Sequence, residues 1–94
     1  MAVRAVIGLK LSGPGAGGRA AERLREVKGV SVLGAVASRR DLVAAILVAV
    51  KDLRALKWAV EEARRVEGVR EAIVLMAGEE LWAELARMDE EGYP

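Results

Sequence analysis

Two kinds of hydrophobic pattern alternate along this chain of 94 residues. Four runs are mainly apolar without helical spacing, which is typical of buried strands. Two runs between them place apolar residues three or four positions apart, as an amphipathic helix does. The predicted strands span Val3–Leu11, Val30–Ala37, Leu42–Val50 and Val69–Met76, one helix spans Gly17–Val27, and the other begins with Asp52 as its N-cap and ends at Gly68.

A short motif occurs twice and connects these elements. Residues 24–30 read Leu-Arg-Glu-Val-Lys-Gly-Val, and residues 63–69 read Ala-Arg-Arg-Val-Glu-Gly-Val. Each copy ends a helix with a glycine, Gly29 or Gly68, suited to the left-handed conformation that closes helices. Each copy then leads into a strand. Two tandem strand–helix–strand units predict an α+β fold, the ferredoxin-like βαββαβ sandwich with a four-stranded antiparallel sheet.

The chain length corresponds to one domain, residues 1–94. Its core is expected within residues 3–77. After Gly78, the run Glu79–Asp89 predicts a third, short helix, and the last five residues form a tail. The C-terminal part of the domain therefore comprises residues 79–94, with apolar positions at Leu81, Leu85 and Met88.

The strand at Leu42–Val50 is apolar on both faces, so both faces of the sheet need a cover at this point. In the predicted fold the two helices cover one face only. A second copy that packs sheet to sheet in a two-fold homodimer is the simplest cover for the other face. The predicted third helix is the alternative cover for part of it.

Composition and charge argue against several classes of function. The net charge of +1 predicts no strong attraction to nucleic acid or to anionic membranes. Apolar runs are too short to cross a bilayer, the start of the chain lacks a signal-peptide pattern, and cysteine is absent. These features predict a soluble cytoplasmic protein. The absence of Asn and Gln and the many Arg, Glu, Val and Ala residues point weakly to a thermophilic source.

The residue types argue against catalysis. With neither Cys nor His, the chain cannot assemble a relay for nucleophilic attack. Its paired glutamates fall on predicted helix surfaces or in the tail, and no loop has the oxygen ligands of a cation site. We therefore predict no enzymatic activity, no cofactor and no metal. The strands that stack bases in RNA-recognition domains carry no aromatic residue here, which excludes that mode of binding.

The loop at residues 12–18 is rich in glycine and precedes a helix, where backbone N–H groups can bind anions. It lacks the Gly-Lys-Ser/Thr ending of a Walker motif, since Gly18 is followed by Arg19 and Ala20. A flexible connection between strand and helix is the favoured interpretation.

The turn Ser38-Arg39-Arg40-Asp41 is the best polar candidate for a binding site. It joins two apolar strands, so its side chains project from the end of a hairpin. Two guanidinium groups and one carboxylate within four residues suit the two charged ends of a zwitterion. An ordinary charged turn that keeps the hairpin soluble is the competing interpretation.

Trp58 lies roughly opposite the predicted buried stripe of the second helix, which is formed by Leu53, Leu56, Val60 and Ala63. A large aromatic side chain there is exposed unless something covers it. Packing by Trp82, burial against another subunit and a role as a ligand platform all stay open.

The order of these motifs resembles the effector-binding domain of Lrp/AsnC transcription regulators over about residues 3–77. The most family-like parts are Lys28-Gly29-Val30, Val36 to Leu42, Asp52-Leu53 and Glu67-Gly68-Val69. Because the first strand begins at residue 3, no helix-turn-helix precedes it in this sequence. The chain is thus similar to a stand-alone form of that domain.

The resemblance implies an amino-acid-sensing module that forms homodimers through its sheets and assembles dimers into rings. In that family, effectors bind between dimers near the hairpin whose pattern is Gly-x-Tyr-Asp. Here Asp41 matches this pattern, whereas Ser38 and Arg40 depart from it. Asp41 would accept from the ammonium group of a small amino-acid-like ligand, and Arg39 or Arg40 would hold its carboxylate. Full-length Lrp/AsnC-type regulators are the implied partners in mixed oligomers, and no direct contact with nucleic acid or membrane is expected.

Two other classes of function stay open at this point. A small enzyme of the dimeric α/β-barrel type has the same fold and face-to-face sheets. A pure assembly domain without a ligand would have a filled, dry interface.

Overall fold

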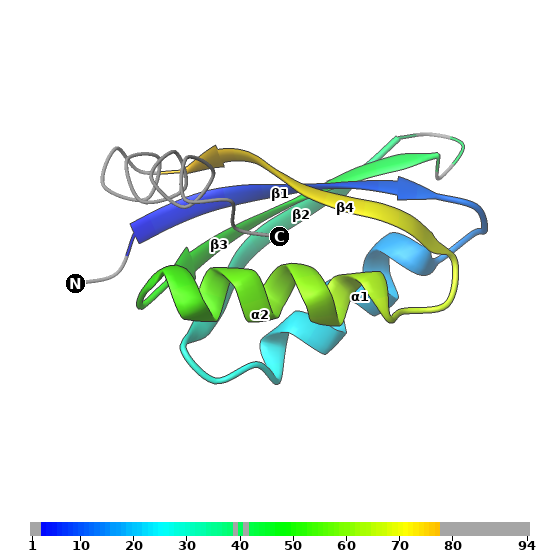
Figure 1. The fold of residues 1–94 in the computed structure, drawn as a ribbon. Helices are drawn as coiled ribbons and strands as arrows, with labels where there is room; N and C mark the ends of the chain where they lie inside the picture. Colours follow the sequence, from blue (N-terminus) through cyan, green and yellow to red (C-terminus); the bar gives the residue numbers. More distant parts are fainter. Residues whose placement is uncertain (1–2, 39, 41, 78–94) are drawn as a thin grey trace, which may run out of the picture.

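The computed structural model describes residues 3–38, 40 and 42–77 and shows a sheet covered on one face by two helices (Figure 1). The elements follow in the order β1, α1, β2, β3, α2, β4. Neighbouring strands pair antiparallel in the order β2-β3-β1-β4. This arrangement confirms the predicted ferredoxin-like class. The elements are β1 Val3–Leu11, α1 Ala16–Arg25, β2 Val30–Ala37, β3 Val43–Val50, α2 Leu53–Arg64 and β4 Val69–Ala77.

The core lies between the sheet and the helices. Alternate residues of the two central strands, such as Ile7 in β1 and Ile46 in β3, are completely buried, as are Leu24 of α1 and Leu56 of α2. Most other buried helix positions are alanines, which let the helices approach the sheet closely. Among the described residues no polar or charged side chain is buried. The helix-facing side of the sheet is therefore a purely apolar layer.

The helix ends differ slightly from their predicted positions. Helix α1 begins one residue before Gly17 and ends at Arg25, two residues before the predicted end at Val27. The amide of Val27 donates to the carbonyl of Leu24 at 3.1 Å, so the chain leaves the helix in a tighter turn. Helix α2 begins as predicted, because Asp52 Oδ1 accepts from the Ala55 amide at 2.8 Å, but it ends at Arg64, four residues before the predicted end at Gly68.

The two repeated glycines take the left-handed conformation that the motif predicts. Gly29 has φ +83° and Gly68 has φ +92°. Each lies in the turn between a helix and the following strand, and not directly at the helix end. The repeat therefore encodes the helix-to-strand connection of each half of the fold.

The predicted third helix at Glu79–Asp89, the tail after it and Trp82 lie outside the described residues. Within the described part of the chain, no helix has the length and apolar character needed to span a bilayer.

Candidate functional site

The face of the sheet that points away from the helices, here called the outer sheet face, is apolar and open. Strand pairing places Val36 of β2 beside Ala45 of β3, and Ile73 of β4 beside Gly8 of β1. Val36 is 71% exposed, which is far more than an apolar side chain in a sheet usually keeps. The large exposed apolar residues of this face are Val36, Val43, Leu47, Ile73 and Leu75. An exposed apolar patch of this kind is typical of an interaction surface.

A groove of about 450 Å³ crosses the outer sheet face near the β2–β3 hairpin. Leu75 forms part of its wall, because a register shift in the β1–β4 pairing places its side chain over Gly8. A Cβ added to Gly8 would lie 2.5 Å from Leu75 Cδ1, so glycine leaves the space that Leu75 fills. The ion pair between Lys10 Nζ and Glu71 Oε2, at 3.4 Å, also lines the groove.

Ser38 connects the groove to the hairpin turn that the sequence singles out. Its side chain lines the groove, and its hydroxyl oxygen accepts from the amides of Leu42 at 3.0 Å and Val43 at 3.2 Å. Its own amide donates to the Val43 carbonyl at 2.9 Å. The oxygen of Ser38 therefore closes the turn, which leaves only its O–H proton for a ligand.

Of the other three residues of the predicted binding site, the structure describes one. Arg40 is exposed in the turn, whereas Arg39 and Asp41 lie outside the described residues. A ligand site formed by Ser38, Arg39, Arg40 and Asp41 stays a prediction.

The glycine-rich loop before α1 is tied to the loop before β4. The Ser12 amide donates to the Gly68 carbonyl at 2.8 Å, and the Arg19 guanidinium donates to the carbonyls of Glu67 at 3.0 Å and Pro14 at 3.3 Å. Arg19 therefore connects this loop to the second copy of the repeated motif. These contacts give the loop a role in joining the two halves of the fold.

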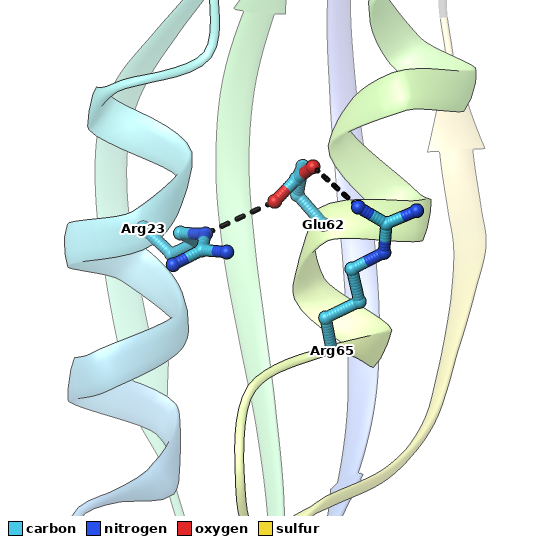
Figure 2. Close-up of polar contacts among 3 residues, drawn as sticks. All are labelled: Arg23, Glu62 and Arg65. Atoms are coloured by element: carbon cyan, nitrogen blue, oxygen red, sulfur yellow. Dashed lines mark hydrogen bonds and ion pairs between the residues drawn. The ribbon is translucent and has the colours of Figure 1, made fainter.

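On the helix side, Glu62 of α2 joins the two helices through arginine (Figure 2). Arg23 Nε of α1 donates to Glu62 Oε2 at 3.0 Å, and an Arg65 guanidinium nitrogen donates to Oε1 at 3.3 Å. The hydrogen bond from Arg23 is the main cause that lowers the pKa of Glu62 below its ordinary value. Partial burial opposes this shift, and the charges of both arginines and a hydrogen bond from Trp58 add to it.

The same region contains a second cavity, here called the helix-side cleft, of about 620 Å³. Trp58 is 58% exposed in it, which confirms that this side chain points away from the buried stripe of α2. The hydrophobic pattern of α2 indicates the exposed indole but not the surrounding residues, which come from α1, α2 and two loops. The lining residues are Arg23, Glu26, Val27, Lys28, Lys51, Asp52, Arg54, Ala55, Trp58 and Glu62.

No protein-family model matches the sequence, and no curated protein matches it either. Among solved structures, the ACT domain from the GTP pyrophosphokinase of Chlorobium tepidum is similar to this chain. The two share 17% identity with a TM-score of 0.64, over 80% of this chain and all of that one. At this identity the likeness shows a common fold. Membership of the Lrp/AsnC family, whose effector-binding domain has a similar fold, stays a prediction.

Proposed function

We propose that this chain is a non-catalytic regulatory module that pairs with a second copy through its outer sheet face and binds a small amino-acid-like effector beside the β2–β3 hairpin. The open apolar outer face, with a groove that reaches Ser38, is the observation that carries this proposal. The ACT-like fold favours a domain that binds a small ligand for regulation.

The physical reason for pairing is the apolar surface itself. Full burial of one Val, Leu or Ile side chain stabilises a protein by about 1.5–3 kcal/mol. The exposed residues of the outer sheet face gain only part of this free energy in a single protomer. In a two-fold dimer each of them would be buried twice, once in each protomer. The Lys10–Glu71 ion pair would lie within or beside such an interface. Its two exposed side chains need no desolvation if they stay at the rim.

The effector would bind where the interface meets the hairpin. Asp41 would accept from an ammonium group, and Arg39 or Arg40, with amides of the turn, would hold a carboxylate. The Ser38 contacts close the turn, and Ser38 itself lines the groove, which supports an effector site at this hairpin.

Light scattering after size-exclusion chromatography tests the pairing. The Val36→Glu variant places a charge on the outer sheet face and should convert the wild-type dimer to a monomer. Gly18→Glu is the matched control, because Gly18 is exposed on α1 and a Cβ there meets no atom within 4 Å. A monomeric wild type at tens of micromolar, or equal behaviour of both variants, would refute the proposed interface.

A thermal-shift panel of the twenty amino acids at millimolar concentration tests the effector. A ligand that binds only the folded form adds about 2.7 kcal/mol at a hundredfold excess over its Kd. We expect a selective rise in Tm with one or a few amino acids and its loss in Asp41→Ala. A flat panel from a dimeric protein would instead assign the outer sheet face to assembly alone.

The resemblance to Lrp/AsnC regulators extends the proposal to mixed oligomers with full-length regulators of that type, whose assembly state would shift on pairing. Mixing the purified chain with such a regulator and measuring the mass of the complex tests this extension. A regulator whose mass stays unchanged would argue against it.

A further inference from the structure

The helix-side cleft lies on the opposite side of the sheet from the surface proposed for pairing, so it is independent of that proposal. Residues of α1 and α2 line it together with two loops, and two of the lining residues, Arg23 and Glu62, are drawn in Figure 2. Its volume of about 620 Å³ falls in the usual range for small-molecule sites, about 300–1,000 Å³. The cleft therefore has room for a compact ligand with one ring system.

Trp58 provides an aromatic surface at this cleft. The indole is exposed and lies one helical turn from Glu62, whose carboxylate is held by Arg23 and Arg65. The exposed indole offers its ring face for stacking. Stacking of a base on an aromatic residue is favourable, so this cleft favours ligands with a planar ring over ligands without one.

Two loops that are distant in sequence bring positive charge to the cleft. The Lys51 amide donates to the Gly29 carbonyl at 2.9 Å, and the methylenes of Lys51 lie beside Gly29, next to Lys28. Arg54 adds a third cation from the first turn of α2. Within residues 3–38, 40 and 42–77, the side chains of these three residues have neither a hydrogen bond nor an ion pair.

The charge balance selects the kind of ligand. The residues that line the cleft include four cationic and three anionic side chains, an excess of one positive charge. A phosphate monoester, with about −1.5 to −2 charges at pH 7, is attracted by this excess and by the exposed cations Lys28, Lys51 and Arg54. A zwitterionic amino acid, which has no net charge, would leave this excess in place. The groups counted are Arg23, Lys28, Lys51 and Arg54 against Glu26, Asp52 and Glu62.

We propose that the helix-side cleft binds a nucleoside monophosphate, with the base stacked on Trp58 and the phosphate held by Lys28, Lys51 and Arg54. The ring and the anion are both required, because the indole supplies the stacking surface and the three cations supply the charge. Binding at this site weakens as salt rises, since all three cations are exposed.

Fluorescence titration with AMP tests the site directly. The Trp82→Phe background leaves Trp58 as the single tryptophan, so quenching by AMP reports this cleft alone. We expect saturable quenching by AMP, with at least about tenfold weaker binding of adenosine and of inorganic phosphate. Absence of saturation at millimolar AMP, or equal binding of adenosine or phosphate, would overturn the proposal.

Matched variants separate the cleft from general charge effects. In the same background, Arg54→Gln should weaken AMP binding about tenfold or more, because one charge-assisted contact is lost. Arg70→Gln removes a cation from the exposed surface of β4, outside the cleft, and should bind AMP as the parent does. Equal loss in both variants would assign the binding to overall charge and refute the site.

Calorimetry with Trp58→Leu provides a readout that does not depend on the fluorophore. We expect the heat of AMP binding to disappear while the circular dichroism spectrum stays unchanged.

A short oligoadenylate is the last ligand in the series. If it binds more than about tenfold more tightly than AMP per site, the cleft belongs to a nucleic-acid strand and the free-nucleotide proposal fails.

Discussion

Replacement of Gly68 by alanine should destabilise the protein through two separate effects. Gly68 has φ +92°, a conformation that costs an L-residue about 1–2 kcal/mol. A Cβ at this position would also lie 2.8 Å from Ala16 Cβ, well inside the carbon–carbon contact distance of about 3.5–4.0 Å. Ala16 is completely buried at the start of α1, so it cannot move without disturbing the core.

The two effects add to a sizeable loss. Overpacking of this kind costs about 1–3 kcal/mol, which with the backbone cost gives about 2–5 kcal/mol of unfolding free energy. For a domain of this size each kcal/mol corresponds to a Tm change of about 4–8 °C. We therefore expect Gly68→Ala to lower Tm by about 8 °C or more.

Urea denaturation and thermal melts, both followed by circular dichroism at one protein concentration for all variants, measure the unfolding free energy and Tm. Gly29→Ala is the internal comparison, because φ is +83° there but the nearest atom, Ala55 Cβ, lies farther away at 3.2 Å. Gly29→Ala should lower the unfolding free energy mainly by the cost of the left-handed backbone, about 1–2 kcal/mol. Gly18→Ala, inside α1, should gain about 0.5–1 kcal/mol from helix propensity.

The ranking of the three variants decides the argument. If Gly68→Ala lowers the unfolding free energy no more than Gly29→Ala does, the close approach of Gly68 to Ala16 does not contribute to the loss of stability. If both variants lie within 0.5 kcal/mol of the wild type, the left-handed conformation of the repeated glycines is not what the motif specifies.

Three further changes have defined outcomes in the same unfolding assay. Ile46→Ala should cost about 2–5 kcal/mol, since this side chain is completely buried in the central strand β3, and Ile46→Val should cost only about 0.5–1.5 kcal/mol. Asp52→Ala should cost about 1 kcal/mol through loss of the α2 cap, whereas Asp52→Asn should keep the cap and most of the stability. The folded-state pKa of Glu62 is lower than its ordinary value of 4.5, so its stabilising contribution is present above that pH and is lost as pH falls through the folded value. Glu62→Gln should therefore flatten the decline in unfolding free energy between neutral and acidic pH, and an unchanged slope would show that the arginine contacts do not stabilise the ionised form.

The amino-acid pattern alone was sufficient for the order and type of the six described elements. Apolar spacing identifies a strand or a helix locally, because a side chain's direction repeats with a fixed period along each element. The repeated motif identified both helix-to-strand connections, and Asp52 identified the start of α2. The exact end of α1 was not predicted, because a tighter turn competes with one more helical residue there.

The candidate sites were predictable only in part. Open apolar positions on the sheet followed from the two-sided pattern of β3, and the exposure of Trp58 followed from its place opposite the buried stripe. The use of the Ser38 oxygen to close the hairpin was not predicted, because a charged turn pattern does not specify which backbone amides lie within reach of a side chain.

Sequence by itself determined which residues share a face of each element, since this depends only on local periodicity. Tertiary structure decided which distant residues meet. Lys51 comes beside Gly29 and Lys28, Arg23 reaches Glu62 from the neighbouring helix, and Leu75 covers Gly8 through a register shift. The physical reason is that these distances depend on strand order, register and helix packing, which arise from the sum of many weak contacts and not from any local pattern.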